Sequence, residues 1–172
     1  WWLLGVIVSF YFGARHQVKS QQFQREIVGS MAHVPQVMTN IKATYTTLTG
    51  IIHSAGVIAD NFIVKKSRQE FDKVIAPKVT GVVNLDNASR EFSLDFFVCF
   101  SSVSGALGNI GQADYATANA FMDHYVDYRN QLQQQGECKG VSISINWPLW
   151  SQGGMQVDEG TLRGLQQSGQ AP

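Results

Sequence analysis

The sequence predicts an α/β fold built on a doubly wound parallel sheet. Short apolar runs alternate with longer segments in which apolar residues recur every three or four positions. Strand, helix, strand, helix and strand therefore follow one another over about a hundred residues. The run at 94–101 is mainly apolar, as is typical of a parallel strand that is covered on both faces.

Composition points to an ordinary globular domain. The 172 residues are enough for one domain with a substantial core. Because 13 basic and 13 acidic side chains give a formal charge of zero, neither nucleic acid nor an acidic membrane surface is favoured as a partner. Cys99 and Cys138 do not form a disulfide framework, so we expect a reducing, cytoplasmic setting.

The segment 1–12 is nearly all apolar. It is shorter than the roughly 20 residues that cross a bilayer as a helix, and it lacks the features of a signal peptide. Its aromatic and β-branched residues favour a buried strand, with a membrane anchor as the alternative. A weak surface helix is expected at 17–30. The chain opens without an initiating Met, so we expect a piece of a longer protein.

The next elements are a helix at 35–48, which Gly50 is expected to end, and a short apolar strand at 51–57. A second helix begins at Ser67, which forms a capping box with Glu70. Its apolar stripe consists of Phe71, Val74, Ile75, Val79, Val82 and Val83. Lys78 lies on this stripe next to Pro77, which is expected to bend the helix.

The strand at 94–101 leads into a glycine-rich loop at 102–111, a long helix at 112–134 and a strand at 141–147. After Pro148 the chain becomes polar and glycine-rich, which predicts a lid or tail. Ser54, Ser102 and Pro148 each follow a predicted strand. Because parallel strands end at the same edge of a sheet, these three ends are expected to meet in one crevice.

The stretch 97–121, FVCFSSVSGALGNIGQADYATANAF, carries the strongest chemical signal. Ser102 stands where the strand ends, and Tyr115 and Asn119 are one turn apart on the following helix. This arrangement aims polar groups at a ligand lying over the sheet and suits delivery of a proton to a carbonyl group.

Taken together, Lys78 in APKVTG, Ser102 in FSSVSG, Tyr115 in GQADYATAN and Asn119 resemble the ketoreductase domain of modular polyketide synthases. That family belongs to the short-chain dehydrogenase/reductase superfamily, whose fold is Rossmann-like. The segments HSAGV (53–57) and NWPLW (146–150) also match the family. Most of the superfamily has the Lys and Asn in exchanged places; the order seen here is typical of the polyketide and animal fatty acid synthase type. The resemblance covers about 50–155.

The resemblance implies NADPH-dependent reduction of a β-ketoacyl thioester that an acyl carrier protein holds on phosphopantetheine, next to other domains of the same synthase. Tyr115 would donate the proton to the ketone oxygen, and Ser102 would hydrogen-bond that oxygen. Lys78 would supply a positive charge, held in place directly or through water by Asn119. The residues that the resemblance assigns to the cofactor are His53, Ser54, Ala55, Gly56, Lys78, Tyr115, Pro148 and Leu149.

The family comparison also addresses stereochemistry. Asp60 matches the acidic residue that marks ketoreductases giving the D-hydroxy (B-type) product, although Ala59 stands where the motif has its first Asp. Leu107 stands where the opposite class carries Trp, and Gln112 is expected at the same substrate site. The resemblance therefore implies the D-alcohol.

The sequence departs from the family at its N-terminal side, since no Gly-x-Gly turn for the cofactor pyrophosphate occurs in the chain. Arg15 is the one candidate for the 2′-phosphate of NADPH. We therefore expect a Rossmann-like domain that is truncated at its N-terminus. Its parts would be a divergent or incomplete segment at 1–49, the catalytic portion at 50–150 and a lid or C-terminal tail at 151–172.

Each candidate also has a structural interpretation: a packed Tyr115, a strand-ending Ser102, a Lys78 that reaches solvent, and an Asn119 that satisfies helix backbone. The histidines have no metal-ligand spacing, so no metal is expected, and His53 reads more readily as a structural hydrogen-bonding residue. Lys65, Lys66 and Arg68 predict a solvated face, or less readily a docking surface for an acidic carrier protein. A fatty-acid-type 3-oxoacyl carrier-protein reductase and a catalytically silent remnant remain as alternative functions.

Overall fold

The structure is a computed structural model that describes residues 6–9, 34–45 and 47–150, together with the single positions 163, 167 and 169. The predicted helix at 17–30, Arg15 and almost all of the segment 151–172 lie outside the described residues. Strand β1 (Val6–Ser9) falls within the apolar segment for which a strand was expected.

The described strands form one parallel sheet. β1, β2 (Gly50–His53), β3 (Phe96–Ser102) and β4 (Val141–Trp147) lie side by side in chain order. The register aligns His53 with Cys99 and Cys99 with Ser144. The α/β fold with a parallel sheet is thus confirmed, although the described strands do not include the reversal of order that makes a sheet doubly wound.

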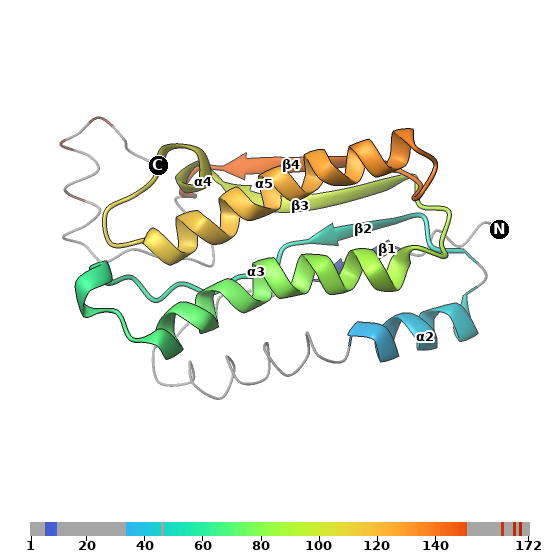
Figure 1. Cartoon of the computed structure of the whole chain (residues 1–172), viewed down its shortest axis with the longest axis horizontal. Coiled ribbons are helices and arrows are strands. Elements are labelled where there is room, and N and C mark those ends of the chain that lie inside the picture. The colour runs from blue at the N-terminus through green and yellow to red at the C-terminus, as the bar shows by residue number, and fades with distance from the viewer. Residues whose placement is uncertain are drawn as a thin grey trace.

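Two long helices cover one face of the sheet, as Figure 1 shows. Helix α3 (Arg68–Ser89) connects β2 to β3, and α5 (Ala113–Gln134) connects β3 to β4. The shorter α2 (Val34–Thr44) packs beside α3. A 3₁₀ turn, η2 (Ile63–Lys65), and a short helix, α4 (Val103–Leu107), complete the described elements. Both long crossovers run in the same direction across the sheet, so both helices lie on the same face.

Helix α3 begins at the predicted capping box. The Ser67 backbone N–H donates to Glu70 Oε2 at 2.8 Å, and the Glu70 backbone N–H donates to Ser67 Oγ at 3.2 Å. The helix continues through Pro77 and buries both Pro77 and Lys78. The sequence pattern thus placed Lys78 correctly on the buried face of α3.

The core lies between the sheet and the helices. Ile51, Phe97 and Cys99 contribute from the strands and are fully buried. Each large apolar side chain that is fully buried contributes about 1.5–3 kcal/mol to folding. The helices contribute Val82, Leu85, Met122 and Val126.

A buried ion pair joins the helices to the start of β4. Arg129 Nε donates to Asp86 Oδ1 at 2.8 Å, its Nη1 donates to Ser142 Oγ at 2.8 Å, and its guanidinium lies 4.7 Å from the Phe97 ring centroid. Asp86 also accepts from Tyr125 and Arg90. Because every charged atom of Asp86 and Arg129 has a partner, this network fixes α5 against α3 without an uncompensated charge.

Three element boundaries differ from the sequence-based expectation. The helix expected at 35–48 ends at Thr44, and Gly50 opens β2 instead of ending that helix. A Cβ at Gly50 would lie 2.3 Å from the Phe96 ring, so a larger residue there would force that ring to move. The strand expected at 51–57 ends at His53, and the expected loop at 102–111 contains α4.

Candidate active site

The candidate site lies at the carboxyl edge of the sheet. The strand arrows in Figure 1 point to this end of the molecule, where η2, α4 and the first turn of α5 also lie. Ser54 follows β2, Ser102 ends β3 and Pro148 follows β4, so three neighbouring strands deliver their following residues to one edge. This is the place where open α/β sheets bind ligands.

Lys78 reaches this edge from α3. Its side chain is buried, its Nζ donates to the Phe100 carbonyl oxygen at 2.9 Å, and its Nζ lies 5.7 Å from the centroid of the Tyr115 ring. Burial lowers the pKa of Lys78 to about 8, an effect that the negative charge of Asp123 opposes. The ammonium group and the phenol are therefore neighbours on the same face of the sheet.

Tyr115 belongs to the first turn of α5 and is 9% exposed. Burial raises the pKa of its phenol, while hydrogen bonds to the side chains of Ser102 and Asn119 oppose that rise. The phenol therefore keeps its proton at neutral pH. A protonated hydroxyl with hydrogen-bonding neighbours at a ligand-binding edge is suited to proton donation.

Ser102 has two roles in the geometry. It is the last residue of β3 and the N-cap of α4, and its Oγ accepts from the Ser104 N–H at 3.2 Å. The structural interpretation of Ser102 as a strand-ending residue is thus correct. The same hydroxyl also bonds Tyr115, so capping and site geometry are served together.

Asn119 is fully buried one turn after Tyr115. Its Nδ2 donates to the Tyr115 carbonyl oxygen at 2.7 Å, which satisfies helix backbone as the structural interpretation expects. Its Oδ1 has no hydrogen-bond partner among the described residues. Leaving such an acceptor unpaired costs about 1–3 kcal/mol, so the position calls for a donor such as water or a ligand.

Asp60 and Gln112, which are 52 positions apart in the chain, are joined by a hydrogen bond. Gln112 Nε2 donates to Asp60 Oδ2 at 2.8 Å, and Gln112 Oε1 accepts from Ser104 Oγ and Asn109 Nδ2. Burial raises the pKa of Asp60, against the opposing effect of the Gln112 hydrogen bond. Leu107, by contrast, is 84% exposed on α4.

The residues assigned to the cofactor differ in how far they are exposed to solvent. His53 is fully buried beneath the helices, and burial lowers the pKa of its imidazole to about 3, with a further lowering from the Lys78 charge. Neither ring nitrogen has a hydrogen bond of good geometry among the described residues. An interaction with the Pro77 backbone partly offsets the lowering of the His53 pKa. The His53 side chain is thus part of the core. Of the remaining positions, Ala55 and Gly56 are also buried, Ser54 and Leu149 are partly exposed, and Pro148 is exposed.

The expectation that the basic run 65–68 forms a solvated face is wrong for Lys66. Its side chain is 2% exposed and pairs with Asp114, whose side chain is 1% exposed. An acidic residue in the first turn of a predicted helix could have suggested a charge interaction there. No local pattern could have identified a lysine 48 positions earlier as the partner.

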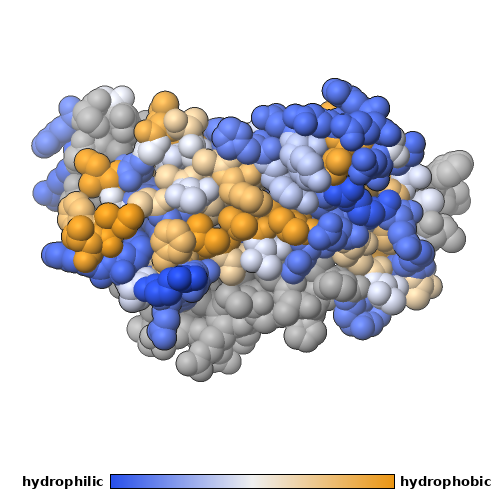
Figure 2. Space-filling view, viewed as in Figure 1, coloured by the Kyte–Doolittle hydropathy of each residue, from blue (hydrophilic) through white to orange (hydrophobic). Residues whose placement is uncertain are grey.

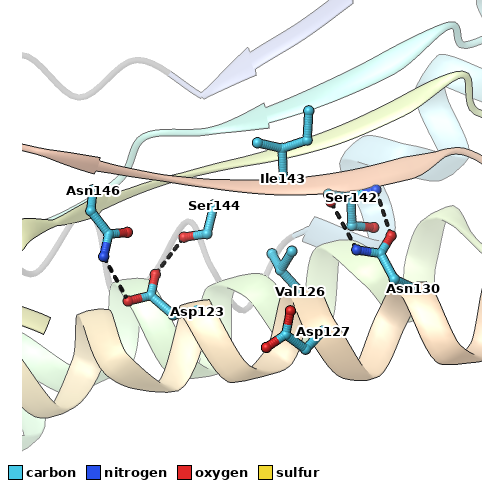
Figure 3. A pocket seen from close by; sticks show the side chains of 8 residues that line it. All are labelled: Asp123, Val126, Asp127, Asn130, Ser142, Ile143, Ser144 and Asn146. Atoms are coloured by element: carbon cyan, nitrogen blue, oxygen red, sulfur yellow. Dashed lines mark hydrogen bonds between the residues drawn. The ribbon is translucent and has the colours of Figure 1, made fainter. Parts of the chain in front are cut away.

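A groove of about 460 Å³ lies between α5 and β4, as Figure 3 shows. The Asn130 amide pairs with the backbone of Ser142 at 2.9 and 3.0 Å, and Asp123 accepts from Ser144 and Asn146. These contacts fasten the helix to the strand beside the site.

Among the described residues, no group of three or more His, Cys, Asp or Glu side chains is arranged to hold a metal ion. Nor does any described helix combine the length and apolar character needed to cross a membrane.

Comparison with known proteins places these features in context. A family model described as the KR domain matches residues 16–152. Polyketide synthase PksN of Bacillus subtilis is 48% identical over 145 residues, which are 84% of this chain and 3% of that protein. Polyketide synthase ThaG of Burkholderia thailandensis is 43% identical over 136 residues, which are 79% of this chain and 2% of that protein. The chain thus spans only a small part of the curated relatives it matches.

Solved structures agree with the sequence relatives. A ketoreductase domain from the bacillaene assembly line superposes with a TM-score of 0.79 at 40% identity, covering 95% of this chain and 42% of that chain. An N-terminal ketoreductase from the macrolactin assembly line gives a TM-score of 0.67 at 37% identity, covering 85% of this chain and 31% of that chain. A short-chain dehydrogenase from Streptomyces avermitilis, at 16% identity and a TM-score of 0.63, shares the fold; it covers 72% of this chain and 46% of that chain.

Proposed function

The chain belongs to the KR domain family, and on that premise we propose that it carries the catalytic side chains of an NADPH-dependent ketoreductase. The reaction is reduction of a β-ketoacyl thioester to the β-hydroxyacyl thioester during polyketide synthesis. One observation supports this proposal above all: Lys78, Ser102 and Tyr115 come from three different elements and gather at one edge of the sheet.

Tyr115 donates the proton to the ketone oxygen. Its raised pKa keeps the proton on the phenol until negative charge develops on the substrate oxygen. The nearby Lys78 ammonium stabilises the phenolate that is left behind, since an opposite charge favours the ionised form. Ser102 supplies a further hydrogen bond to the oxygen as its charge grows.

The family implies a nicotinamide cofactor, and the donors and acceptors of this site fit one. Lys78 has three N–H donors but uses one of them, to the Phe100 carbonyl oxygen, within the described residues. Its remaining donors and the unpaired Asn119 Oδ1 would pair with the hydroxyl groups of a ribose or with bridging water. When bound, the cofactor supplies the hydride.

Lys78 and Tyr115 would hold the nicotinamide end of the cofactor, and the backbone of 54–56 and 148–149 would line it from the neighbouring strand ends. His53 would act only by packing, because its side chain is fully buried. NADPH rather than NADH, with Arg15 near the 2′-phosphate, remains part of the proposal.

The substrate is proposed to arrive on the phosphopantetheine arm of an acyl carrier protein, in a cytoplasmic synthase whose other domains adjoin this one. Residues 50–150 would form the catalytic portion, between a divergent or incomplete N-terminal part at 1–49 and the lid or tail at 151–172. Asp60 and Gln112, which are hydrogen-bonded to each other, would orient the thioester so that the D-alcohol forms, with Leu107 as a third residue of this substrate site.

The test uses the full-length polypeptide that carries these residues. We expect consumption of NADPH that depends on a β-ketoacyl thioester presented on a carrier protein, and a D-configured product in chiral chromatography. Turnover with NADH but not NADPH would contradict the cofactor assignment, and an L-configured product would contradict the stereochemical one. Absence of any thioester-dependent turnover would refute the ketoreductase proposal itself.

A further inference from the structure

We propose that Lys66 is a positioning residue of this site, whose buried ammonium group ties the segment carrying Asp60 to the first turn of the helix carrying Tyr115. The inference rests on the proposed function for its effect on catalysis. The tie itself is a property of the fold and can be tested without turnover.

Lys66 makes two contacts from a buried position. Its Nζ donates to Asp114 Oδ2 at 2.5 Å and to the Ala59 carbonyl oxygen at 2.5 Å. The side chains of Lys66 and Asp114 are 2% and 1% exposed. Solvent therefore screens this ion pair little, unlike an ion pair on the protein surface.

Asp114 transmits this contact to the helix. It is the second residue of α5, and its other carboxylate oxygen accepts from the Tyr115 backbone N–H at 2.9 Å. The N-cap Gln112 makes no side-chain cap, so Asp114 provides the negative charge and an acceptor at this helix end. The position of Tyr115 at the start of α5 thus depends on a carboxylate that Lys66 holds.

The opposite end of the tie is the segment 59–61. Lys66 holds Ala59, Gln112 holds the Asp60 carboxyl group at 2.8 Å, and the Asn61 N–H donates to the Gly111 carbonyl oxygen at 2.9 Å. Three consecutive residues are therefore bonded, directly or through Lys66, to the turn that opens α5. The distance between the Asp60 carboxyl group and the Tyr115 phenol is set by these bonds.

The energetics favour a positioning role over simple stabilisation. The attraction between two buried charges is largely offset by the free-energy cost of removing them from water. A well-packed apolar pair would therefore stabilise the fold equally well. What an apolar pair would not do is bond Ala59, next to Asp60, and hold the carboxylate next to Tyr115. Each residue that Lys66 contacts is thus a direct neighbour in the chain of a residue of the proposed site.

The experiment compares Lys66→Met with Lys65→Met in the full-length polypeptide. Lys65 is the matched control, because its exposed side chain makes no hydrogen bond or ion pair within the described residues. For Lys66→Met we expect kcat to fall about 10- to 100-fold with KM for NADPH unchanged, and the minor alcohol enantiomer to rise about tenfold. Both variants are assayed with a soluble β-ketoacyl thioester, so that docking of a carrier protein does not affect the rates. For Lys65→Met we expect the wild-type values.

Since Lys66→Met leaves Asp114 as an uncompensated buried charge, a second variant removes both charges. Lys66→Met/Asp114→Asn is expected to recover the thermal midpoint, while the loss of stereochemical control persists because Ala59 is still released. Recovery of kcat and of the enantiomer ratio together with stability would overturn the positioning role.

Hydrogen exchange separates failure of this inference from failure of the proposed function. The Asn61 and Tyr115 amides are expected to exchange roughly tenfold faster in the double variant than in Lys65→Met, because their local structure opens more often. Unchanged exchange at both amides would refute the tie even if the wild type is an active ketoreductase. Faster exchange in a polypeptide that reduces no thioester would support the tie and refute only the ketoreductase proposal.

Discussion

The lowered pKa of Lys78 leads to a quantitative prediction for the pH dependence of reduction. Burial lowers this pKa from 10.5 to about 8, so the ammonium group loses its proton within an accessible range. The proposed mechanism needs the charged form, because the cation stabilises the developing phenolate of Tyr115. We therefore expect reduction to slow as the pH rises through the pKa of Lys78.

The magnitude follows from the fraction of Lys78 that is protonated. With a pKa of about 8, roughly nine tenths of the side chains are charged at about pH 7 and roughly one tenth at about pH 9. The rate should thus fall about tenfold over this interval, with a single ionisation. An ordinary lysine would remain charged throughout the same range.

The assay is kcat/KM for a soluble β-ketoacyl thioester, followed by NADPH absorbance at each pH, since kcat/KM reports the ionisations of the enzyme before substrate binds. A rate that stays constant to about pH 10 would refute the prediction that reduction depends on a Lys78 ammonium group with a pKa of about 8.

The pH dependence of folding stability provides the control. The contribution of Lys78 to stability should rise with pH, whereas the rate of reduction should fall. Between about pH 8 and 10.5 the unfolded chain binds the Lys78 proton more tightly than the folded chain, so this group makes folding more favourable as the pH rises. Lys78→Met should therefore raise the thermal midpoint near neutral pH, with a gain that shrinks above about pH 8, while activity falls. A variant that is less stable than the wild type at neutral pH would contradict the cost assigned to the buried charge.

Three other substitutions test the site and the fold. Tyr115→Phe should lower kcat about 10²- to 10⁴-fold with an unchanged circular dichroism spectrum, and retained turnover would remove the phenol from its role. Gly140→Ala should destabilise the chain by about 1–3 kcal/mol in urea unfolding, because Gly140 has φ +84° and a Cβ there would lie 2.7 Å from the Leu94 carbonyl oxygen. Gly136→Ala is its control, with φ +80° but no atom within 4 Å, so an equal loss would show that the Leu94 contact contributes nothing. Ser67→Ala should lower the free energy of unfolding by about 1 kcal/mol through loss of the capping box, and no change would place the start of α3 elsewhere.

Local signals in the sequence predicted where several residues of the candidate site lie in their helices and strands. The capping box at Ser67 fixes where α3 begins, and the helical period from there places Lys78 on the buried face. Tyr115 and Asn119 lie one turn apart on α5 for the same reason, and Ser102 ends β3 as the change from apolar to small polar residues indicates. Such features depend on neighbours within a few positions along the chain.

The errors share a different physical origin. Gly50 looks like a helix terminator, but it opens β2 and lies against the ring of Phe96 on the neighbouring strand. The run 65–68 looks solvated, but Lys66 pairs with Asp114. In each case the environment of the residue is set by a side chain that is distant in the sequence and close in space.

The amino-acid sequence by itself determined the order of strands and helices, their buried faces and the edge of the sheet at which Ser102 and Tyr115 meet, because these follow from periodicity and chain direction. Only the tertiary structure decided the environments of the charges: that burial lowers the pKa of Lys78, and that Lys66 bonds Ala59 and Asp114. Desolvation and ion pairing depend on which groups surround a side chain in space, and packing between distant segments sets those groups.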